Sequence, residues 1–378
     1  LMSNGDNDKA YDVIQEVLAE DPSNIKALQS LFLYYINNDE RERADSISRC
    51  ILLSPKSTTE EKVYELRIAI AHNEEEGGDS TQVLKLFRDV LDQPNPDADI
   101  AEMLAAYMQL KKMPSDSIDK ALERVLELDP SRTSARLMLV QSAWQAEDKD
   151  RIISLCQAAR AYNPEEMAFY YYQGMAYYQQ DDKDKALEAF QEGIDVITPQ
   201  SNPAIVSDFY AVMGDLLHQK GMAREAFEAY DSCLQWKDNN IMCLNNYAYY
   251  LSELGQQLDK AEQMSFKAIK AEPKNATYLD TYAWILFMQE RYAEAKVYID
   301  QALQNDSDSS AVITEHAGDI YMMSGDADRA VELWQQALAA SPDNKLLVRK
   351  IKRRKYLKNQ LRDPPAQLIL ERDHLDGL

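Results

Sequence analysis

Glycine and proline are scarce in this sequence. The 378 residues include 11 glycines and 13 prolines, roughly half of the share that globular proteins usually carry. A chain of many strands needs these residues at its turns, so their scarcity argues against all-β and Rossmann-like folds. The 4 cysteines show neither CxxC pairs nor zinc-ligand spacing, which excludes a disulfide-stapled domain and a zinc finger.

The cysteines are interpreted as small core residues. They are Cys50, Cys156, Cys233 and Cys243. Cys233 and Cys243 fall on helices that we expect to be neighbours, where a disulfide would form only in an oxidising compartment. The sequence does not decide whether these two residues are ever bridged.

Positive charge is also in short supply. The chain has 41 Lys and Arg against 64 Asp and Glu, a net charge of −23, which repels the phosphates of nucleic acids and anionic lipid headgroups. The longest apolar run, residues 282–288, is far shorter than the roughly 20 residues of a membrane-spanning helix. We therefore expect no nucleic-acid partner and no membrane span.

The first residues lack the basic start and the apolar stretch of a signal peptide. We expect residues upstream of Leu1, including any signal or lipid anchor, to be missing from this sequence. Localisation therefore stays open. A lipid-anchored protein would lie in the periplasm or cell envelope, and otherwise the protein would be cytoplasmic.

Catalytic signatures are absent as well. The sequence contains no GxGxxG, no P-loop, no HExxH and no GxSxG, so dinucleotide, triphosphate, zinc-protease and hydrolase chemistry have no motif behind them. The four histidines stand alone and do not recur at i and i+4. No loop has the alternating oxygen ligands of a calcium site. We expect a protein that is not an enzyme and has no cofactor, no metal and no catalytic residue.

What the chain does have is a repeat with a period near 34 residues. Small or apolar residues recur at Ile118, Ile152, Ala186, Ala226, Ala261, Ala295 and Ala330. In several units a proline follows twelve residues later, as Pro130, Pro164, Pro273 and Pro342 do. Within each unit apolar residues recur twice at helical spacing around a short polar turn, which predicts a pair of antiparallel helices.

The best units carry a glycine, then an aromatic or leucine residue, an alanine and an aromatic residue in a fixed order, and two of them also have a tyrosine before the glycine. They are Tyr170, Gly174, Tyr177, Ala186 and Phe190, then Tyr210, Gly214, Leu217, Ala226 and Tyr230, then Gly318, Tyr321, Ala330, Trp334 and Pro342. This order resembles the consensus of the tetratricopeptide repeat (TPR), most closely that of bacterial proteins of the envelope-lipoprotein type. The resemblance implies an all-α fold, a right-handed α-solenoid or superhelix of about ten helix pairs.

Three segments follow from the repeat. Residues 1–344 are predicted to form the superhelix, with irregular units around 56–117 and about six inserted residues between Ile194 and Pro203. Residues 345–362 hold nine cations and no acid, and we expect a basic helix that caps the last pair. Residues 363–378 are predicted to be a loosely attached tail.

The resemblance also implies which side chains face the concave groove, namely those at the inward positions of the first helix of each pair. They are Trp144, Tyr171, Met175, Tyr178, Asp208, Asp215, His218, Asn245, Asn246, Tyr249, Asp280, Trp284, Phe287, Asp319 and Met322. This set has aromatic, amide and carboxylate groups but no Lys or Arg. A clamp for a C-terminal carboxylate is therefore not expected, whereas aromatic anchors beside carboxylates suit an extended neutral or basic peptide.

We expect a non-enzymatic scaffold for protein–protein interaction, which binds an extended peptide or a partner protein in this groove. Two alternatives remain open. The chain could be the regulatory or substrate-recruiting region of a longer enzyme, or a structural component of a cell-envelope assembly. The sequence does not identify the partner, the pathway or the oligomeric state.

Overall fold

The computed structural model describes residues 7–75, 77 and 79–358. These residues form 20 α-helices and no strand, which confirms the predicted all-α solenoid. None of the described helices is long and apolar enough to span a bilayer. The chain divides into two compact units, residues 1–164 and residues 165–378. Each unit is described by itself.

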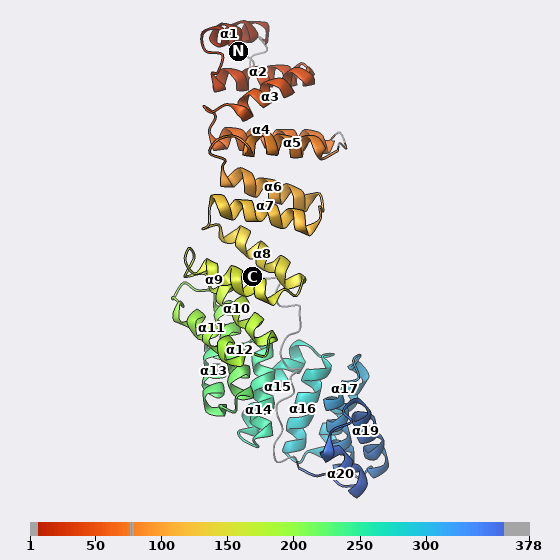
Figure 1. Cartoon of the computed structure of the whole chain (residues 1–378). Helices are drawn as coiled ribbons and strands as arrows, with labels where there is room; N and C mark the ends of the chain where they lie inside the picture. Colours follow the sequence, from red (N-terminus) through yellow and green to blue (C-terminus); the bar gives the residue numbers. More distant parts are fainter. Residues whose placement is uncertain (1–6, 76, 78, 359–378) are drawn as a thin grey trace. The chain divides into compact units, whose positions relative to one another are not determined.

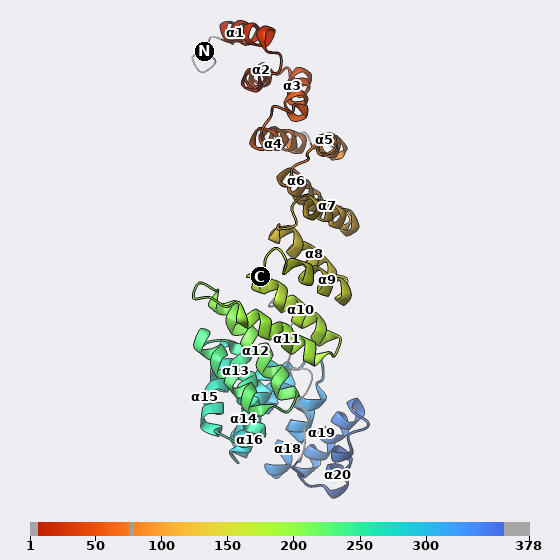
Figure 2. The same cartoon turned by 60° about the vertical axis from the view of Figure 1, so that its left-hand side comes forward.

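Unit 1 contains the first nine described helices. They are α1 (Asn7–Glu20), α2 (Ile25–Asn37), α3 (Arg41–Leu53), α4 (Thr59–Glu75), α5 (Thr81–Leu91), α6 (Ala98–Leu110), α7 (Ser115–Leu128), α8 (Thr133–Gln145) and α9 (Lys149–Ala159). The helices from α2 onwards pack as successive antiparallel pairs, and α6 lies beside α7 in both views (Figures 1 and 2).

Unit 2 contains the other eleven. They are α10 (Met167–Gln179), α11 (Lys183–Asp195), α12 (Pro203–Gln219), α13 (Ala223–Trp236), α14 (Ile241–Glu253), α15 (Leu258–Ala271), α16 (Ala276–Met288), α17 (Tyr292–Asn305), α18 (Ala311–Met323), α19 (Ala327–Ala340) and α20 (Lys345–Arg353). One apolar core runs through successive pairs from α12 to α19, as expected when no pair can bury its apolar face alone.

Small residues let the two helices of a pair approach each other. A Cβ atom added to Gly174 would lie 2.7 Å from the Phe190 ring, and one added to Gly214 would lie 2.5 Å from Tyr230. Both distances are shorter than real Cβ contacts. The glycine and the aromatic residue sixteen positions later therefore form one packing unit, as the repeat consensus predicts.

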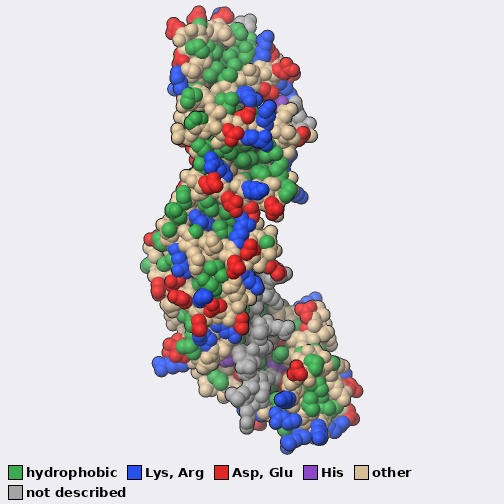
Figure 3. Space-filling model, in the orientation of Figure 1, with side chains coloured by type: hydrophobic (Ala, Val, Ile, Leu, Met, Phe, Trp, Pro, Cys, Tyr) green, Lys and Arg blue, Asp and Glu red, His purple; other side chains and the backbone are tan. Residues whose placement is uncertain are grey.

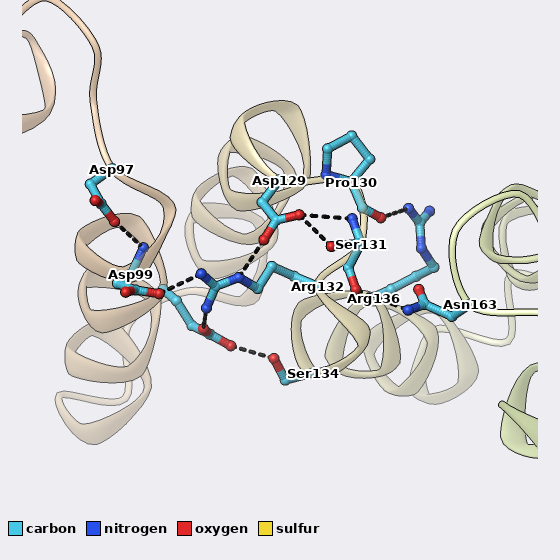
Figure 4. A network of polar contacts seen from close by, with 10 residues as sticks. Asp97, Asp99, Asp129, Pro130, Ser131, Arg132, Ser134, Arg136 and Asn163 are labelled. Carbon is cyan, nitrogen blue, oxygen red and sulfur yellow. Dashed lines mark hydrogen bonds and ion pairs between the residues drawn. The ribbon is translucent and has the colours of Figure 1, made fainter. Parts of the chain in front are cut away.

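Turns between pairs are held by side chains as well as by the backbone. In unit 1 the Arg132 guanidinium points toward three carboxylates (Figure 4). It forms ion pairs with Asp129 at 2.7 Å, with Glu102 at 3.0 Å and with Asp99. The hydrogen bonds that Arg132 donates to Asp129 and Asp99 raise its pKa. The turn before α8 is thereby fastened to α6 of the preceding pair.

The regions predicted to be irregular are helical pairs with longer connections. The segment around 56–117 contains α4, α5 and α6, and the connection between α5 and α6 spans residues 92–97. The insertion after α11 covers residues 196–202, and Pro203 is the first residue of α12, where its fixed φ suits a helix start. The register of the repeat survives both departures.

The basic helix is shorter than expected. We predicted a helix to Arg362, but α20 ends at Arg353 and Arg354 adopts the left-handed conformation, with φ of 48°. Leu347 packs with Trp334 and Ala337 of α19. Lys and Arg side chains gather at this end of unit 2 (Figure 3). Residues 359–362 and the predicted tail 363–378 lie outside the described residues, so the predicted segment boundaries stay predictions.

The cysteines are all free thiols. Cys156, Cys233 and Cys243 are buried, as predicted for core residues. Cys50 of α3 is exposed, so its assignment to the core was wrong. Burial and the nearby Cys233 thiol raise the pKa of Cys243.

Candidate functional site

The predicted groove residues all lie on the first helices of pairs, but most of them are not on the surface. Ten of the fifteen are buried: Tyr171, Met175, Asp215, Asn245, Asn246, Tyr249, Asp280, Trp284, Phe287 and Asp319. Five are half-buried: Trp144, Tyr178, Asp208, His218 and Met322. Trp144 belongs to unit 1 and the other fourteen to unit 2.

Asp215 is a core carboxyl group with no exposed surface. It accepts a hydrogen bond from the Tyr230 hydroxyl, and the Asn246 amide donates to both of its oxygens, at 3.2 and 3.0 Å. Burial raises its pKa to about 7, although these hydrogen bonds oppose the shift. Asn245 donates in turn to Asn246 at 3.3 Å. These three predicted groove residues therefore bond to one another and to the second helix of the pair.

Three half-buried residues among the predicted groove residues also contact other side chains of unit 2. The Asn240 amide donates to Asp208 at 2.8 Å, and Gln219 donates to the Tyr178 hydroxyl at 3.1 Å. The His218 ring stacks on Tyr250 with centroids 3.6 Å apart. Burial lowers the pKa of His218 to about 4, so this ring is neutral at physiological pH.

Trp284 is the centre of an aromatic cluster in unit 2. Its ring stacks on Phe287 at 4.7 Å and on His316 at 4.1 Å between centroids, and its indole N–H donates to Glu253 at 2.7 Å. Nδ1 of His316 lies 2.9 Å from both oxygens of Asp280. His316 was not among the predicted groove residues, although it precedes Gly318 by two positions, just as the predicted Asn246 precedes Ala248.

A second residue that sequence reasoning missed is Lys350 of α20. Its ammonium is buried and donates to both oxygens of Asp319 at 2.7 Å and to Glu315 at 2.9 Å. Asp319 also accepts from the Trp334 indole at 3.0 Å. The fifteen predicted groove residues include no Lys or Arg, and the capping helix α20 supplies a cation to one of them. A charge run in the sequence gives no sign of which of its cations is buried.

Two of the predicted residues border an open cleft of about 360 Å³. Tyr249 and Asp280 line it from α14 and α16, and the turn before α18 contributes Asp306 and Asp308. The other lining groups include Asn275, Thr277, Asn305 and Ser310. No cation lines this cleft among the described residues, so its electrostatic potential is negative.

No described part of the chain groups three or more His, Cys, Asp or Glu side chains in a way that could hold a metal ion. The carboxylates of the site face amides, hydroxyls, a histidine and a lysine. Such an arrangement can bind and orient a ligand through hydrogen bonds and charge.

Comparison with known proteins identifies the repeat. The family described as tetratricopeptide repeat matches residues 137–202, 207–240 and 286–354. A TPR repeat-containing protein of Pseudomonas aeruginosa, PA4667, is 26% identical over 229 residues, which cover 57% of this chain and 36% of that protein. The chain thus spans about a third of the length of this relative.

Solved structures are similar in fold. The APC/C hetero-tetramer Cut9–Hcn1 superposes with a TM-score of 0.52 at 14% identity, covering 93% of this chain and 74% of the other. A tetratricopeptide repeat protein from Parabacteroides merdae superposes with a TM-score of 0.48 at 14% identity, covering 68% and 98%. At such identities the similarity concerns the fold alone.

Proposed function

We propose that this chain, which carries tetratricopeptide repeats, is a non-enzymatic scaffold that binds an extended segment of a partner protein along the inner helices of unit 2. Repeats of this family are generally protein-interaction scaffolds. The observation that carries the proposal is the cleft beside Tyr249 and Asp280, where an aromatic ring and carboxylates meet on the predicted groove face.

The charge of this cleft favours a basic segment. Asp306 and Asp308 stand at the turn before α18, and Asp280 lies deeper between the helices. A Lys or Arg side chain of the partner would gain charge-assisted hydrogen bonds there, while backbone amides would meet the Asn275 and Asn305 side chains. Exposed carboxylates of this kind speed association and select the partner more than they add affinity.

Because the predicted aromatic anchors are buried, they offer little surface for contact with a partner. Trp284 and Tyr249 were predicted to be anchors, yet 5% and 2% of their surfaces are exposed. Their truncation to alanine would open a cavity as well as remove a contact. The rim of the cleft is therefore the better place to test the proposal, and the roles of the fifteen predicted residues stay predictions.

The test is affinity capture from a cell lysate with the full chain and two charge variants. Asp308→Lys reverses a charge at the cleft, and Asp343→Lys makes the same change at an exposed turn outside it. We expect Asp308→Lys alone to lose the captured protein, while circular dichroism shows both variants folded. A partner that both variants retain would contradict this site, and capture of nothing by the parent chain would contradict the scaffold proposal.

Two simpler measurements address the alternatives, namely the regulatory region of a longer enzyme and a component of a cell-envelope assembly. The chain covers about a third of its curated relative, so the mass of the native polypeptide tells whether there is room for a further domain beside these repeats, as the enzyme alternative requires. The mature N-terminus would show directly whether the protein carries a lipid, as a cell-envelope component would.

A further inference from the structure

Unit 2 has a second groove, which we call the outer groove. It has an open volume of about 520 Å³, with α12 as its floor and α11 and α13 as its walls. Tyr210, Met213 and Leu217 form the floor. Because an α-helix advances 100° per residue, these three side chains lie on the side of α12 opposite to Asp208 and Asp215. The outer groove is therefore separate from the site of the proposed function.

The equivalent space is filled in the pair that follows. There Tyr247 takes the place of Met213, and its ring stacks on Phe227 with centroids 5.3 Å apart. The Lys260 ammonium lies 4.4 Å from the centre of the Tyr247 ring and donates to its hydroxyl at 2.9 Å. In that pair the side chains of Tyr247 and Lys260 themselves fill the space that is open in the outer groove.

Later pairs fill it in related ways. Tyr282 packs edge-on against Tyr298 at 4.7 Å between ring centroids. In the last pair Lys296 lies 4.4 Å from the centre of the Tyr321 ring, whose hydroxyl donates to Asp300 at 2.7 Å.

Small and acidic residues keep the outer groove open. Ala229 occupies the position of Met264, Tyr298 and Leu333 in the three later pairs, and Glu225 occupies that of Lys260. The groove is thus open because its own sequence lacks the side chains that fill the others.

The rim of the outer groove is acidic. Asp184 and Glu188 stand on α11, and Glu225 and Glu228 stand on α13. Asp184 pairs with Lys220, and Glu228 pairs with Arg224 at 3.1 Å. Within the described residues Glu188 and Glu225 form no hydrogen bond or ion pair, although the nearby Lys185 interacts electrostatically with Glu188. The two walls therefore carry more acidic than basic side chains on either side of an apolar floor.

We propose that the outer groove binds one amphipathic helix of a partner protein, with apolar side chains on the floor and Lys or Arg side chains along the rim. The floor residues repeat at i, i+3 and i+7 of α12, a stripe as long as two turns of a docked helix. A helix laid between two walls buries its apolar face as in other helix-in-groove complexes. Charge complementarity selects a basic helix, because four acidic side chains and no Lys or Arg line the groove among the described residues.

The test uses the full chain and a labelled probe peptide of leucine and lysine, with leucines at i, i+3, i+4 and i+7 of a helix. Fluorescence anisotropy measures its dissociation constant. The decisive variant, Glu225→Lys with Ala229→Met, copies Lys260 and Met264 of the next pair and so closes the groove with side chains that this fold already accepts. We expect this variant to bind the probe at least about tenfold more weakly than the parent chain.

Two controls keep the result specific. Asp259→Lys makes the same change of charge at an exposed position of α15 outside the groove and should bind like the parent. A peptide with glutamate in place of every lysine should not bind. Equal binding of the probe by the parent and the groove variant would overturn the proposal, as would equal binding of the two peptides. Self-association of the parent chain that the groove variant abolishes would also overturn it, in favour of a second copy as the occupant.

Discussion

Replacing the buried carboxyl group of Asp215 should change how the stability of unit 2 depends on pH. Asp215 has no exposed surface, and burial raises its pKa from 3.8 to about 7. The folded chain therefore keeps the proton of this carboxyl over a range where the unfolded chain has released it. The contribution of Asp215 to the free energy of unfolding is therefore highest at acid pH, falls as the pH rises from about 4 to about 7, and is constant above that.

The magnitude follows from the shift. About three pKa units correspond to roughly 4 kcal/mol of unfolding free energy lost across the whole range. Between about pH 5.5 and about pH 8.5 the loss due to Asp215 is roughly 2 kcal/mol. Asp215→Asn carries no titrating proton and can still accept from Tyr230, so we expect the variant to lose this part of the pH dependence and to gain on the parent at alkaline pH.

The assay is urea unfolding followed by circular dichroism near pH 5.5 and near pH 8.5, comparing the change in free energy between the two pH values. Asp238→Asn, at an exposed turn, is the matched control and should follow the parent. If Asp215→Asn lost as much stability as the parent between the two pH values, the carboxyl group would be ionised in the folded chain and the reasoning would be refuted. If Asp215→Asn instead lost partner binding with unchanged stability, Asp215 would contact the partner in the groove, as the sequence predicted.

Two further predictions concern packing and the buried charge. Gly174→Leu should lower stability by about 1–3 kcal/mol, because its Cβ alone would lie 2.7 Å from Phe190; an unchanged melting temperature in circular dichroism would contradict the packing described. Lys350→Ala should cost about 3–5 kcal/mol, since it strands the buried carboxylate of Asp319, whereas the exposed Lys352→Ala should cost little. Urea unfolding followed by tryptophan fluorescence measures the stability of both lysine variants. Equal effects of the two would count against the buried pair of Lys350 and Asp319.

The sequence by itself determined the helix pairs and the way each pair closes. The spacing between Gly174 and Phe190 recurs between Gly318 and Trp334. A small residue and an aromatic residue at fixed separation meet in any antiparallel pair with a turn of this length. These contacts are local, and local contacts follow from periodicity. The same periodicity placed all fifteen predicted residues on the first helices of their pairs.

Exposure of those residues was decided by the tertiary structure alone. Asp215 and Asp319 were predicted to meet a partner, but Tyr230 and Asn246 bond to the first, and Lys350 neutralises the second. The bonding groups come from a neighbouring helix or from the capping helix. No pattern within one helix tells which distant side chain will reach an inward-facing carboxylate, and the cost of burying an unpaired charge makes that partner decisive.

The open grooves are a further product of tertiary structure. Ala229 and Glu225 look unremarkable in the sequence, and both fit a helix as well as Met264 and Lys260 do. Their effect becomes visible only when three helices enclose the same space, because a groove is open or filled according to the side chains that several elements deliver to it. Periodicity therefore predicts which face a residue occupies, while packing between helices decides whether that face is free to bind.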